Sequence, residues 1–325
     1  KWAEQFISVT TCDVCNGQRL NQEALHFYIN GKNISELANM ELSDLYEWIG
    51  NVEEHLEDKQ KQIAGEILKE IRTRLKFMLD VGLEYLSLNR QSMTLSGGES
   101  QRIRLATQIG SQLVNVLYIL DEPSIGLHQK DNRKLIHSLQ ELRDNGNSVI
   151  VVEHDKEMME NADYIVDLGP KAGRKGGEIT AIGGYSDILK SDSLTAQYLK
   201  GEKVITIPAE RRAGNGKKIS LKGCTGNNLK NVSVDFPLGK LICVTGVSGS
   251  GKSSLVNGTL HPILSAYFYN ALAAPLPYKS IEGMTEIDKV VVVDQSPLGK
   301  SPRSNPATYT GLFTDIRKIF EKLPE

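Results

Sequence analysis

The residues with the most specific chemistry form a glycine-rich segment. Residues 246–253 read GVSGSGKS and fill every fixed position of the pattern G-x-x-x-x-G-K-[ST], between an apolar run and a helical pattern. Glycines let backbone N–H groups approach phosphate oxygens closely, and a chance glycine-rich turn explains the pattern poorly. Lys252 is expected to pair with β- and γ-phosphates, and the Ser253 hydroxyl to ligate Mg²⁺. The predicted nucleotide-binding residues of this segment are Gly246, Ser248, Gly249, Gly251, Lys252, Ser253 and Ser254.

Two carboxylates and a histidine form a second candidate set. Asp121 and Glu122 directly follow the apolar run 117–120, and His154 follows the strand pattern 149–153. Asp121 would orient the ligands around Mg²⁺, Glu122 would polarise an attacking water as general base, and His154 would contact a γ-phosphate. Acidic residues at a strand end are often only a turn, and a lone histidine is usually structural. These three residues, however, occur at the spacings expected from the other motifs of the sequence.

The segment 95–102, LSGGESQR, resembles the signature motif of ABC ATPases. Paired glycines at a helix start expose backbone N–H groups, and the Ser96 side chain adds a hydroxyl donor. Such a surface can close over the γ-phosphate of a nucleotide held by another domain, although an ordinary helix cap is the alternative. The predicted residues of this motif are Ser96, Gly97 and Gly98.

Two more segments resemble elements of ABC ATPases. Residues 124–127, SIGL, resemble the D-loop that crosses between paired domains. Gln295 follows the apolar run 289–293 and resembles the Q-loop glutamine, which binds Mg²⁺ or water and senses the γ-phosphate.

The alternation of strand and helix patterns places these motifs on an α/β fold. Strands are predicted at 117–120, 148–152 and 164–168, with helices at 129–144 and near 155–162. Strands that alternate with helices favour parallel βαβ units.

The second half of the chain opens with a different pattern. The polar stretch 201–217 has no apolar period and is predicted to be a linker. Residues 218–221 and 232–236 alternate like half-exposed antiparallel strands, whereas 241–245 is apolar enough for a central strand.

A long amphipathic helix is predicted over residues 53–80. Its apolar residues recur every four positions, at Ile63, Ile67, Ile71, Leu75 and Leu79. Its basic side is interpreted as a solvated face, with DNA contact as the alternative, and consists of Lys61, Lys69, Arg72 and Lys76.

The order of the motifs does not fit one ABC domain. A single domain runs from phosphate loop through Q-loop, signature and carboxylates to the histidine, whereas here the signature, carboxylates and histidine come first. The simplest account is the end of one ABC domain joined to the start of a second. The Ser96 and Lys252 loops can then share one composite site, whereas Glu122 and His154 serve a phosphate loop outside this chain. We therefore expect the chain alone to bind nucleotide weakly and to hydrolyse it poorly or not at all.

The predicted fold class is a P-loop NTPase of ABC type. It combines a mixed parallel sheet and flanking helices with an antiparallel β-subdomain and a helical signature subdomain. The predicted divisions are a signature region (residues 1–112), a carboxylate and histidine half (113–200), a linker (201–217) and a phosphate-loop half (218–325).

Longer runs closely resemble the A-subunit family of bacterial excinucleases (UvrA), over essentially the whole chain. They are CDVCNGQRL at 12–20, DEPSIGLH at 121–128, GNNLKN at 226–231, GVSGSGKSSL at 246–255, DQSPLG at 294–299 and RSNPATYTG at 303–311. The resemblance implies a cytoplasmic sensor of DNA damage in nucleotide excision repair. Such a protein uses ATP and Mg²⁺, forms a homodimer, binds damaged double-stranded DNA and loads the excinuclease B subunit.

The same resemblance implies zinc, because the family carries modules of four cysteines. Cys12 and Cys15 look like half of such a site, and a tetrahedral site needs four ligands. Cys224 lies in an unrelated context, and Cys243 on its predicted strand is expected in the core. Zn²⁺ is thus expected in the full protein, and a complete site is not expected in this chain.

Composition sets broader limits. The chain has 325 residues, a soft prior for about two domains, and a net charge of -2, so nothing global indicates a nucleic-acid or membrane partner. No apolar run approaches the roughly 20 residues of a membrane span, and no signal peptide opens the sequence. Because it starts with Lys1, a fragment is expected. A transporter's nucleotide-binding subunit and a non-catalytic DNA-binding or dimerisation module are the rival functions.

Overall fold

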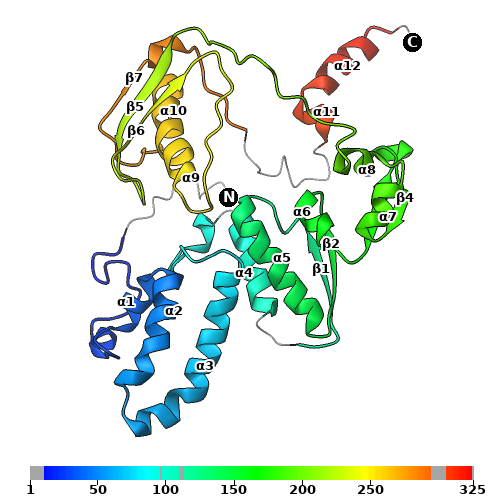
Figure 1. The fold of residues 1–325 in the computed structure, drawn as a ribbon. Coiled ribbons are helices and arrows are strands. Elements are labelled where there is room, and N and C mark those ends of the chain that lie inside the picture. The colour runs from blue at the N-terminus through cyan, green and yellow to red at the C-terminus, as the bar shows by residue number, and fades with distance from the viewer. Residues whose placement is uncertain (1–10, 96, 110–112, 294–304, 324–325) are drawn as a thin grey trace. The chain divides into compact units, whose positions relative to one another are not determined.

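The computed structural model describes residues 11–95, 97–109, 113–293 and 305–323 (Figure 1). The chain divides into two compact units. Unit 1 comprises Lys1–Arg212 and Cys243–Lys252, and unit 2 comprises Ala213–Ile242 and Ser253–Glu325.

Unit 1 begins with a helical region. After the 3-10 turn η2 (Glu23–His26) come α1 (Ile34–Asn39), α2 (Leu42–Asn51), the 3-10 turn η3 (Val52–His55) and α3 (Asp58–Asp80). The start of α1 is fixed by a capping box: the Asn33 side chain accepts from the Glu36 N–H, and the Glu36 side chain accepts from the Asn33 N–H. Leu42, Leu45 and Ile49 of α2 are buried, so this helix packs its apolar face inward.

The predicted long helix exists as α3, and the second half of its predicted stripe packs inward: Leu75 is buried, and Ile71 and Leu79 pack against the core of unit 1. Leu68 and Leu75 are buried, whereas Ile63 and Ile67 are exposed. A step of four residues turns a helix by about 40° beyond a full circle, so a row with this spacing winds around the axis. Arg72 is also not part of a solvated face, because it pairs with Glu53 at 3.1 Å.

The central region of unit 1 is a short parallel sheet with helices. After the 3-10 turn η4 (Ser92–Thr94) follow α4 (Gly97–Ile109), β1 (Leu117–Asp121), α5 (Gln129–Asp144), β2 (Ser148–Val152) and α6 (Lys156–Glu160). β1 and β2 pair in parallel, with Leu117 opposite Ser148 and Asp121 opposite Val152. The predicted βαβ unit is confirmed here, and the predicted bounds of the helix 129–144 are those of α5.

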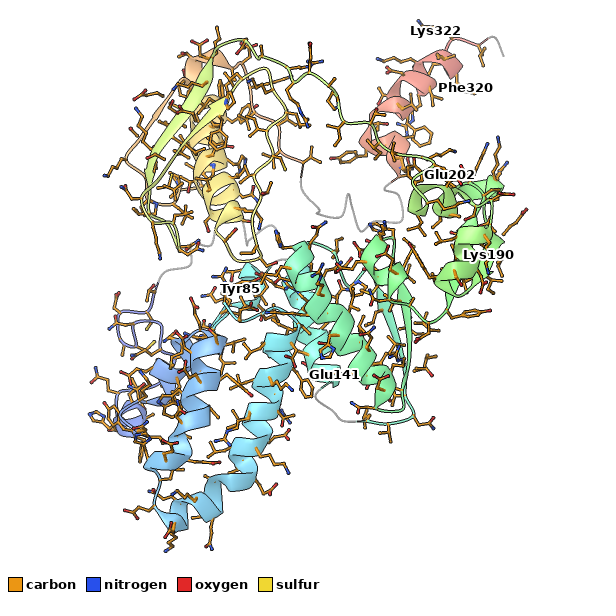
Figure 2. All side chains as sticks on the ribbon, viewed as in Figure 1. Tyr85, Glu141, Lys190, Glu202, Phe320 and Lys322 are labelled. Atoms are coloured by element: carbon orange, nitrogen blue, oxygen red, sulfur yellow. The ribbon has the colours of Figure 1, made fainter. Side chains whose placement is uncertain are left out.

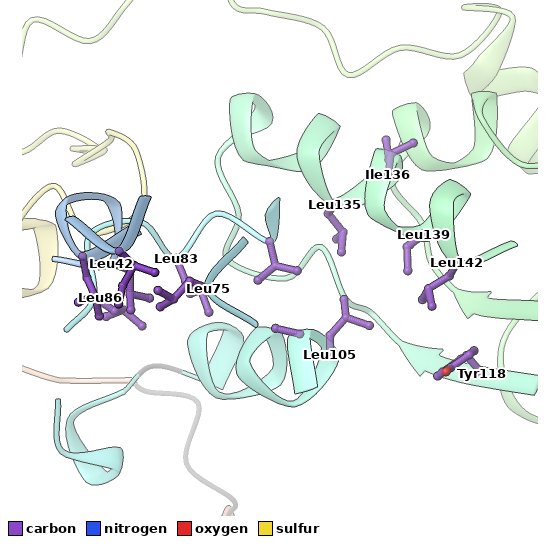
Figure 3. Close-up of a cluster of buried hydrophobic side chains, with 14 of the residues drawn as sticks. Leu42, Leu75, Leu83, Leu86, Leu105, Tyr118, Leu135, Ile136, Leu139 and Leu142 are labelled. Atoms are coloured by element: carbon purple, nitrogen blue, oxygen red, sulfur yellow. The ribbon is translucent and has the colours of Figure 1, made fainter. Parts of the chain in front are cut away.

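The hydrophobic core of unit 1 joins this sheet to the helices (Figure 3). Figure 3 shows Leu135, Leu139 and Leu142 of α5 near Tyr118 of β1, with Leu105 of α4 in the same cluster. Because α5 covers one face of the sheet, the ends of β1 and β2 are held in a fixed register. The opposite face of the sheet carries four exposed apolar side chains: Leu117, Ile119, Ile150 and Val152.

The next strand pair departs from the parallel arrangement predicted for it. β3 (Ile165–Gly169) lies where a strand is predicted, but it pairs antiparallel with β4 (Glu178–Gly183). The 3-10 turn η5 (Gly173–Lys175) joins the two strands directly, and such a short connection permits only an antiparallel pair. Helices α7 (Tyr185–Lys190) and α8 (Leu194–Leu199) follow, and residues 202–217 form an exposed stretch without helix or strand.

Unit 2 is built on an antiparallel sheet. β5 (Lys218–Cys224) lies between β6 (Val232–Pro237) and β7 (Ser280–Glu282), and both pairings are antiparallel. The two predicted antiparallel strands are therefore confirmed. Leu221 and Cys224 of β5 are fully buried, in a core shared with Ile263 and Leu264 of α10 (His261–Tyr269).

The predicted strand at 241–245 is wrong. The segment belongs to the described residues and has no strand structure there, and Leu241 is 100% exposed. Cys243 is likewise exposed rather than in the core. A central strand needs hydrogen-bonding neighbours, and no described strand pairs with this segment. An apolar run alone does not make a strand.

The remaining elements of unit 2 are helical. α9 (Lys252–Leu255) continues through the π-helical segment η6 (Val256–Leu260) into α10. The 3-10 turn η7 (Met284–Glu286), α11 (Pro306–Tyr309) and α12 (Leu312–Phe320) come later. Figure 2 labels Phe320 at the end of α12, where its side chain is exposed. No helix among the described residues is both long and apolar enough to cross a membrane.

Candidate nucleotide site

The carboxyl ends of β1 and β2 bring the predicted catalytic residues together. Asp121 ends β1, and the Glu122 N–H extends the ladder by donating to the Val152 carbonyl at 2.9 Å. Glu122 has a φ of 44°, a left-handed conformation that costs a residue other than glycine about 1–3 kcal/mol. The ladder bond holds this conformation, which turns the chain sharply out of the sheet.

His154 faces Glu122 across this edge. Its Nδ1 lies 3.7 Å from Oε1 of Glu122, an ion pair when the ring is protonated. Both side chains reach solvent, with exposed fractions of 81% for His154 and 44% for Glu122. They line a cavity of about 390 Å³, together with Ser124, Ile125, Gly126, Asp155 and Lys156.

The predicted D-loop, residues 124–127, forms a tight turn beside this cavity. The Ile125 N–H donates to the Glu122 carbonyl at 3.1 Å, and the Leu127 N–H donates to the Ser124 carbonyl at 3.0 Å. Gly126 has a φ of 73°, so the turn uses the conformational freedom of glycine. The turn therefore places a short backbone segment directly after the candidate general base.

The signature segment begins helix α4 and lies against the D-loop. A Cβ added to Gly98 would stand 2.6 Å from the Ile125 carbonyl oxygen, so only glycine fits there. The Gln101 side-chain amide donates to the Asp121 carbonyl at 2.6 Å. The signature helix is thereby fixed to the end of β1. Gly97 is its first residue, and Ser96 lies outside the described residues.

Two residues that sequence reasoning did not select support the signature helix. Arg102 is only 3% exposed, and its guanidinium donates to the carbonyls of Gly98, Val81 and Gly82 at 3.2, 3.3 and 3.0 Å. The Tyr85 hydroxyl, labelled in Figure 2, donates to Glu99 at 2.7 Å. Burial and this bond raise the pKa of Tyr85. The signal that the sequence offered for this role was position, because Arg102 directly follows Gln101, the glutamine of the signature.

Asp155 and Asn132 connect the histidine loop to α5. The buried Asn132 amide donates to the Asp155 carboxylate at 2.9 Å, and the same carboxylate accepts from the Met158 N–H at 2.9 Å as the cap of α6. The histidine loop is therefore anchored on both sides, by the strand before it and the helix after it.

The phosphate-loop residues lie on a turn that precedes α9. Gly246, Gly249 and Gly251 have φ values of 146°, 73° and 97°, which side chains other than glycine adopt rarely. The Lys252 ammonium donates to the carbonyls of Gly246 and Val247, each at 2.8 Å, so it lies over its own loop.

The residues after Lys252 enter the helix as predicted. Ser253 is the second residue of α9, and the next hydroxyl, that of Ser254, accepts from the Asn227 amide at 3.0 Å. The remaining predicted nucleotide residue, Gln295, lies outside the described residues.

The carboxylate oxygens of Asp121 and Glu122 at the β1 edge fit Mg²⁺, because hard cations prefer oxygen ligands. Cys12 and Cys15, the predicted half of a zinc site, lie on a separate turn, in which backbone N–H groups of Cys15 and Val14 lower the pKa of the Cys12 thiol. Across the residues that the structure describes, no group of three or more His, Cys, Asp or Glu side chains converges on a common point. Cys12 and Cys15 alone do not complete a tetrahedral site.

Taken together, the βαβ unit with its carboxylates and histidine, the signature helix and the separate phosphate loop define the ABC type of P-loop fold. The crystal structure of UvrA2 from Deinococcus radiodurans matches 96% of this chain and 39% of that protein, with a TM-score of 0.86 and 42% identity. UvrABC system protein A of a Synechocystis species is 55% identical over 99% of this chain, and that of Thermus thermophilus is 53% identical over 99%. Over nearly its whole length, the chain is therefore similar to proteins of the UvrA family.

The chain spans about a third of the length of the curated relatives it matches, 33% and 34% for these two. No protein-family model matches it.

Proposed function

We propose that this chain contributes catalytic residues of two ATP sites to a DNA-repair excinuclease subunit of the UvrA type. The observation that carries the proposal is the Glu122–His154 pair, 3.7 Å apart at the end of a parallel strand pair and beside a cavity. A strand-end carboxylate and a facing histidine can hold a water and a γ-phosphate oxygen at the same time.

At the first site, Glu122 acts as general base, Asp121 orients the Mg²⁺ ligands and His154 binds the γ-phosphate. Bound Mg²⁺ neutralises charge on the phosphates. The phosphate loop that completes this site comes from outside this chain. Hydrolysis by the chain alone is therefore weak or absent.

At the second site, Lys252 and Ser253 hold phosphate and Mg²⁺, with Gln295 as a further ligand. The signature residues Ser96, Gly97 and Gly98 close over the nucleotide of this site. The support is the arrangement of motifs along the chain, which follows the junction of two ABC domains. On this account the signature region (residues 1–112) and the half 113–200 belong to the first domain, and residues 218–325 belong to the second.

The proposed partners follow from the similarity to UvrA proteins. The relatives carry the name of a UvrABC system. We assign to the full protein damaged double-stranded DNA as substrate, the excinuclease B subunit and a second copy as partners, Zn²⁺ as a structural metal and the bacterial cytoplasm as location. Salt-dependent binding of duplex DNA to the full protein tests the DNA role, because phosphate contacts give a steep salt slope. DNA binding that is absent or does not change with salt concentration contradicts the DNA role.

Nucleotide binding by the chain tests the second site. We expect a fluorescent ATP analogue to bind saturably in the presence of Mg²⁺, and Lys252→Ala to abolish this binding. The control is Lys190→Ala on α7, an exposed lysine that pairs with Asp187 and belongs to none of the predicted nucleotide motifs, and it should leave binding unchanged. Absence of saturable binding, or binding unchanged by Lys252→Ala, overturns the assignment and favours a non-catalytic module.

A further inference from the structure

Glu153 lies between β2 and His154 and binds two loops at once. Its Oε1 accepts from the Ser124 N–H at 2.9 Å, and its Oε2 accepts from the N–H groups of His154 and Asp155 at 3.1 and 3.4 Å. Ser124 opens the D-loop, so one half-buried carboxylate connects the D-loop to the histidine loop.

These loops carry the two side chains whose separation matters for hydrolysis. Ser124 stands two residues after Glu122, and His154 is the next residue after Glu153. The strand ladder fixes the backbone up to Glu122, through its bond to the Val152 carbonyl. Beyond that bond, the Glu153 carboxylate sets one loop against the other.

The ionised form of the Glu153 carboxylate suits the three N–H groups that surround it. Burial works to raise the pKa of Glu153, but hydrogen bonds from Ser124, His154 and Asp155 outweigh it and lower the pKa. An ionised carboxylate is an acceptor only, so both of its oxygens can face N–H groups. A side-chain amide of the same shape has one acceptor oxygen, and its NH₂ group would face an N–H group on the other side.

We propose that Glu153 is a positioning residue that holds His154 and the D-loop in register around Glu122. It acts through the two loops, by accepting hydrogen bonds from their N–H groups. This inference rests on the proposed function of the Glu122 site. It predicts that loss of one acceptor oxygen slows hydrolysis without weakening nucleotide binding.

The test is Glu153→Gln in the full-length protein that contains this chain, with Lys252→Ala present throughout so that turnover reports the Glu122 site alone. We expect kcat for ATP hydrolysis to fall by about tenfold or more, with KM within about twofold, because a hydrogen bond to a charged group is lost while the shape is kept. The matched control is Glu157→Gln on α6, whose carboxylate pairs with the exposed Arg133 instead. Glu157→Gln should leave kcat and KM unchanged.

A second measurement is independent of activity. In Glu153→Gln, amide hydrogen exchange at Ser124 or at His154 should be faster than in the unchanged chain, while exchange at Glu122, bonded to Val152, should be unaltered. Unaltered exchange at both loop amides, or an unaltered kcat, overturns the inference.

Failure of the inference is distinct from failure of the proposed function. If Glu122→Gln abolishes turnover while Glu153→Gln retains it, only the positioning role is wrong. If Glu122→Gln retains full turnover, the proposed function itself is wrong.

Discussion

Gly98 of the signature helix lies directly against Ile125 of the D-loop, and a Cβ at position 98 would stand 2.6 Å from the Ile125 carbonyl oxygen. Backbone cannot move away as a flexible side chain would, so even a methyl group must displace the loop or the helix. The second glycine of the signature thus has a structural role within its own domain, besides the nucleotide contact proposed for it.

Gly98→Ala should therefore lower the free energy of unfolding of unit 1 by about 1–3 kcal/mol, a typical cost of overpacking. Urea unfolding followed by circular dichroism measures this. Gly65→Ala on α3 is the control, because an added Cβ there meets nothing within 4 Å and alanine favours a helix. If Gly98→Ala has the same free energy of unfolding as the unchanged chain, the D-loop moves aside at no measurable cost, and the prediction is wrong.

The buried side chain of Arg102 leads to a second prediction about stability. Arg102→Ala leaves three carbonyls, of Gly98, Val81 and Gly82, without their side-chain donor in a buried place. The expected loss is about 2–4 kcal/mol of unfolding free energy. Arg104→Ala, on the exposed side of the same helix, should change stability by less than about 0.5 kcal/mol. A similar loss for both variants would contradict the importance of the buried guanidinium.

The sequence predicted the elements that form local contacts better than those that need distant partners. Helix 129–144 and strands 117–120 and 148–152 were recovered because their periodicity matches the face they bury against one another. The run 241–245 looks like a central strand by composition, yet forms none, because a strand depends on neighbours that composition does not specify. The antiparallel partner of β3 was missed for the same reason.

The candidate site divides in a similar way. Glu122 and His154 were predictable from motif order, and the structure brings them together. Glu153 and Arg102 were not selected, because their roles depend on backbone N–H and carbonyl groups, which leave no mark in the residue type. A half-buried glutamate next to a histidine reads in sequence as an ordinary surface residue.

The Glu84–Lys134 pair gives a prediction about pH. Burial works to raise the pKa of Glu84, but its own backbone N–H and the Lys134 ammonium, 2.9 Å away, outweigh it and lower the pKa. A lowered folded-state pKa means that the stabilisation is complete above the unfolded pKa and is lost as the pH falls through the folded pKa. The pair should therefore stabilise at neutral pH and cease to do so below the ordinary value of 4.5.

Lys134→Met tests this. Both side chains are more than a third exposed, so the loss near pH 7 should be only about 0.2–1 kcal/mol. The difference from the unchanged chain should shrink as urea unfolding is repeated towards pH 3. Lys69→Met, on the exposed side of α3, should show no such pH-dependent difference. A difference that grows on acidification would contradict the sign of the shift.

The most direct test of the whole account is ATP turnover by Glu122→Gln in the full-length protein that contains this chain, with Lys252→Ala present in both proteins so that turnover reports the Glu122 site. The account predicts that kcat falls at least about a hundredfold relative to Lys252→Ala alone, as expected for loss of a general base, while ATP binding at the Glu122 site is retained. Turnover that stays within about twofold of the Lys252→Ala protein would contradict the assignment of Glu122, and with it the catalytic site at the end of β1.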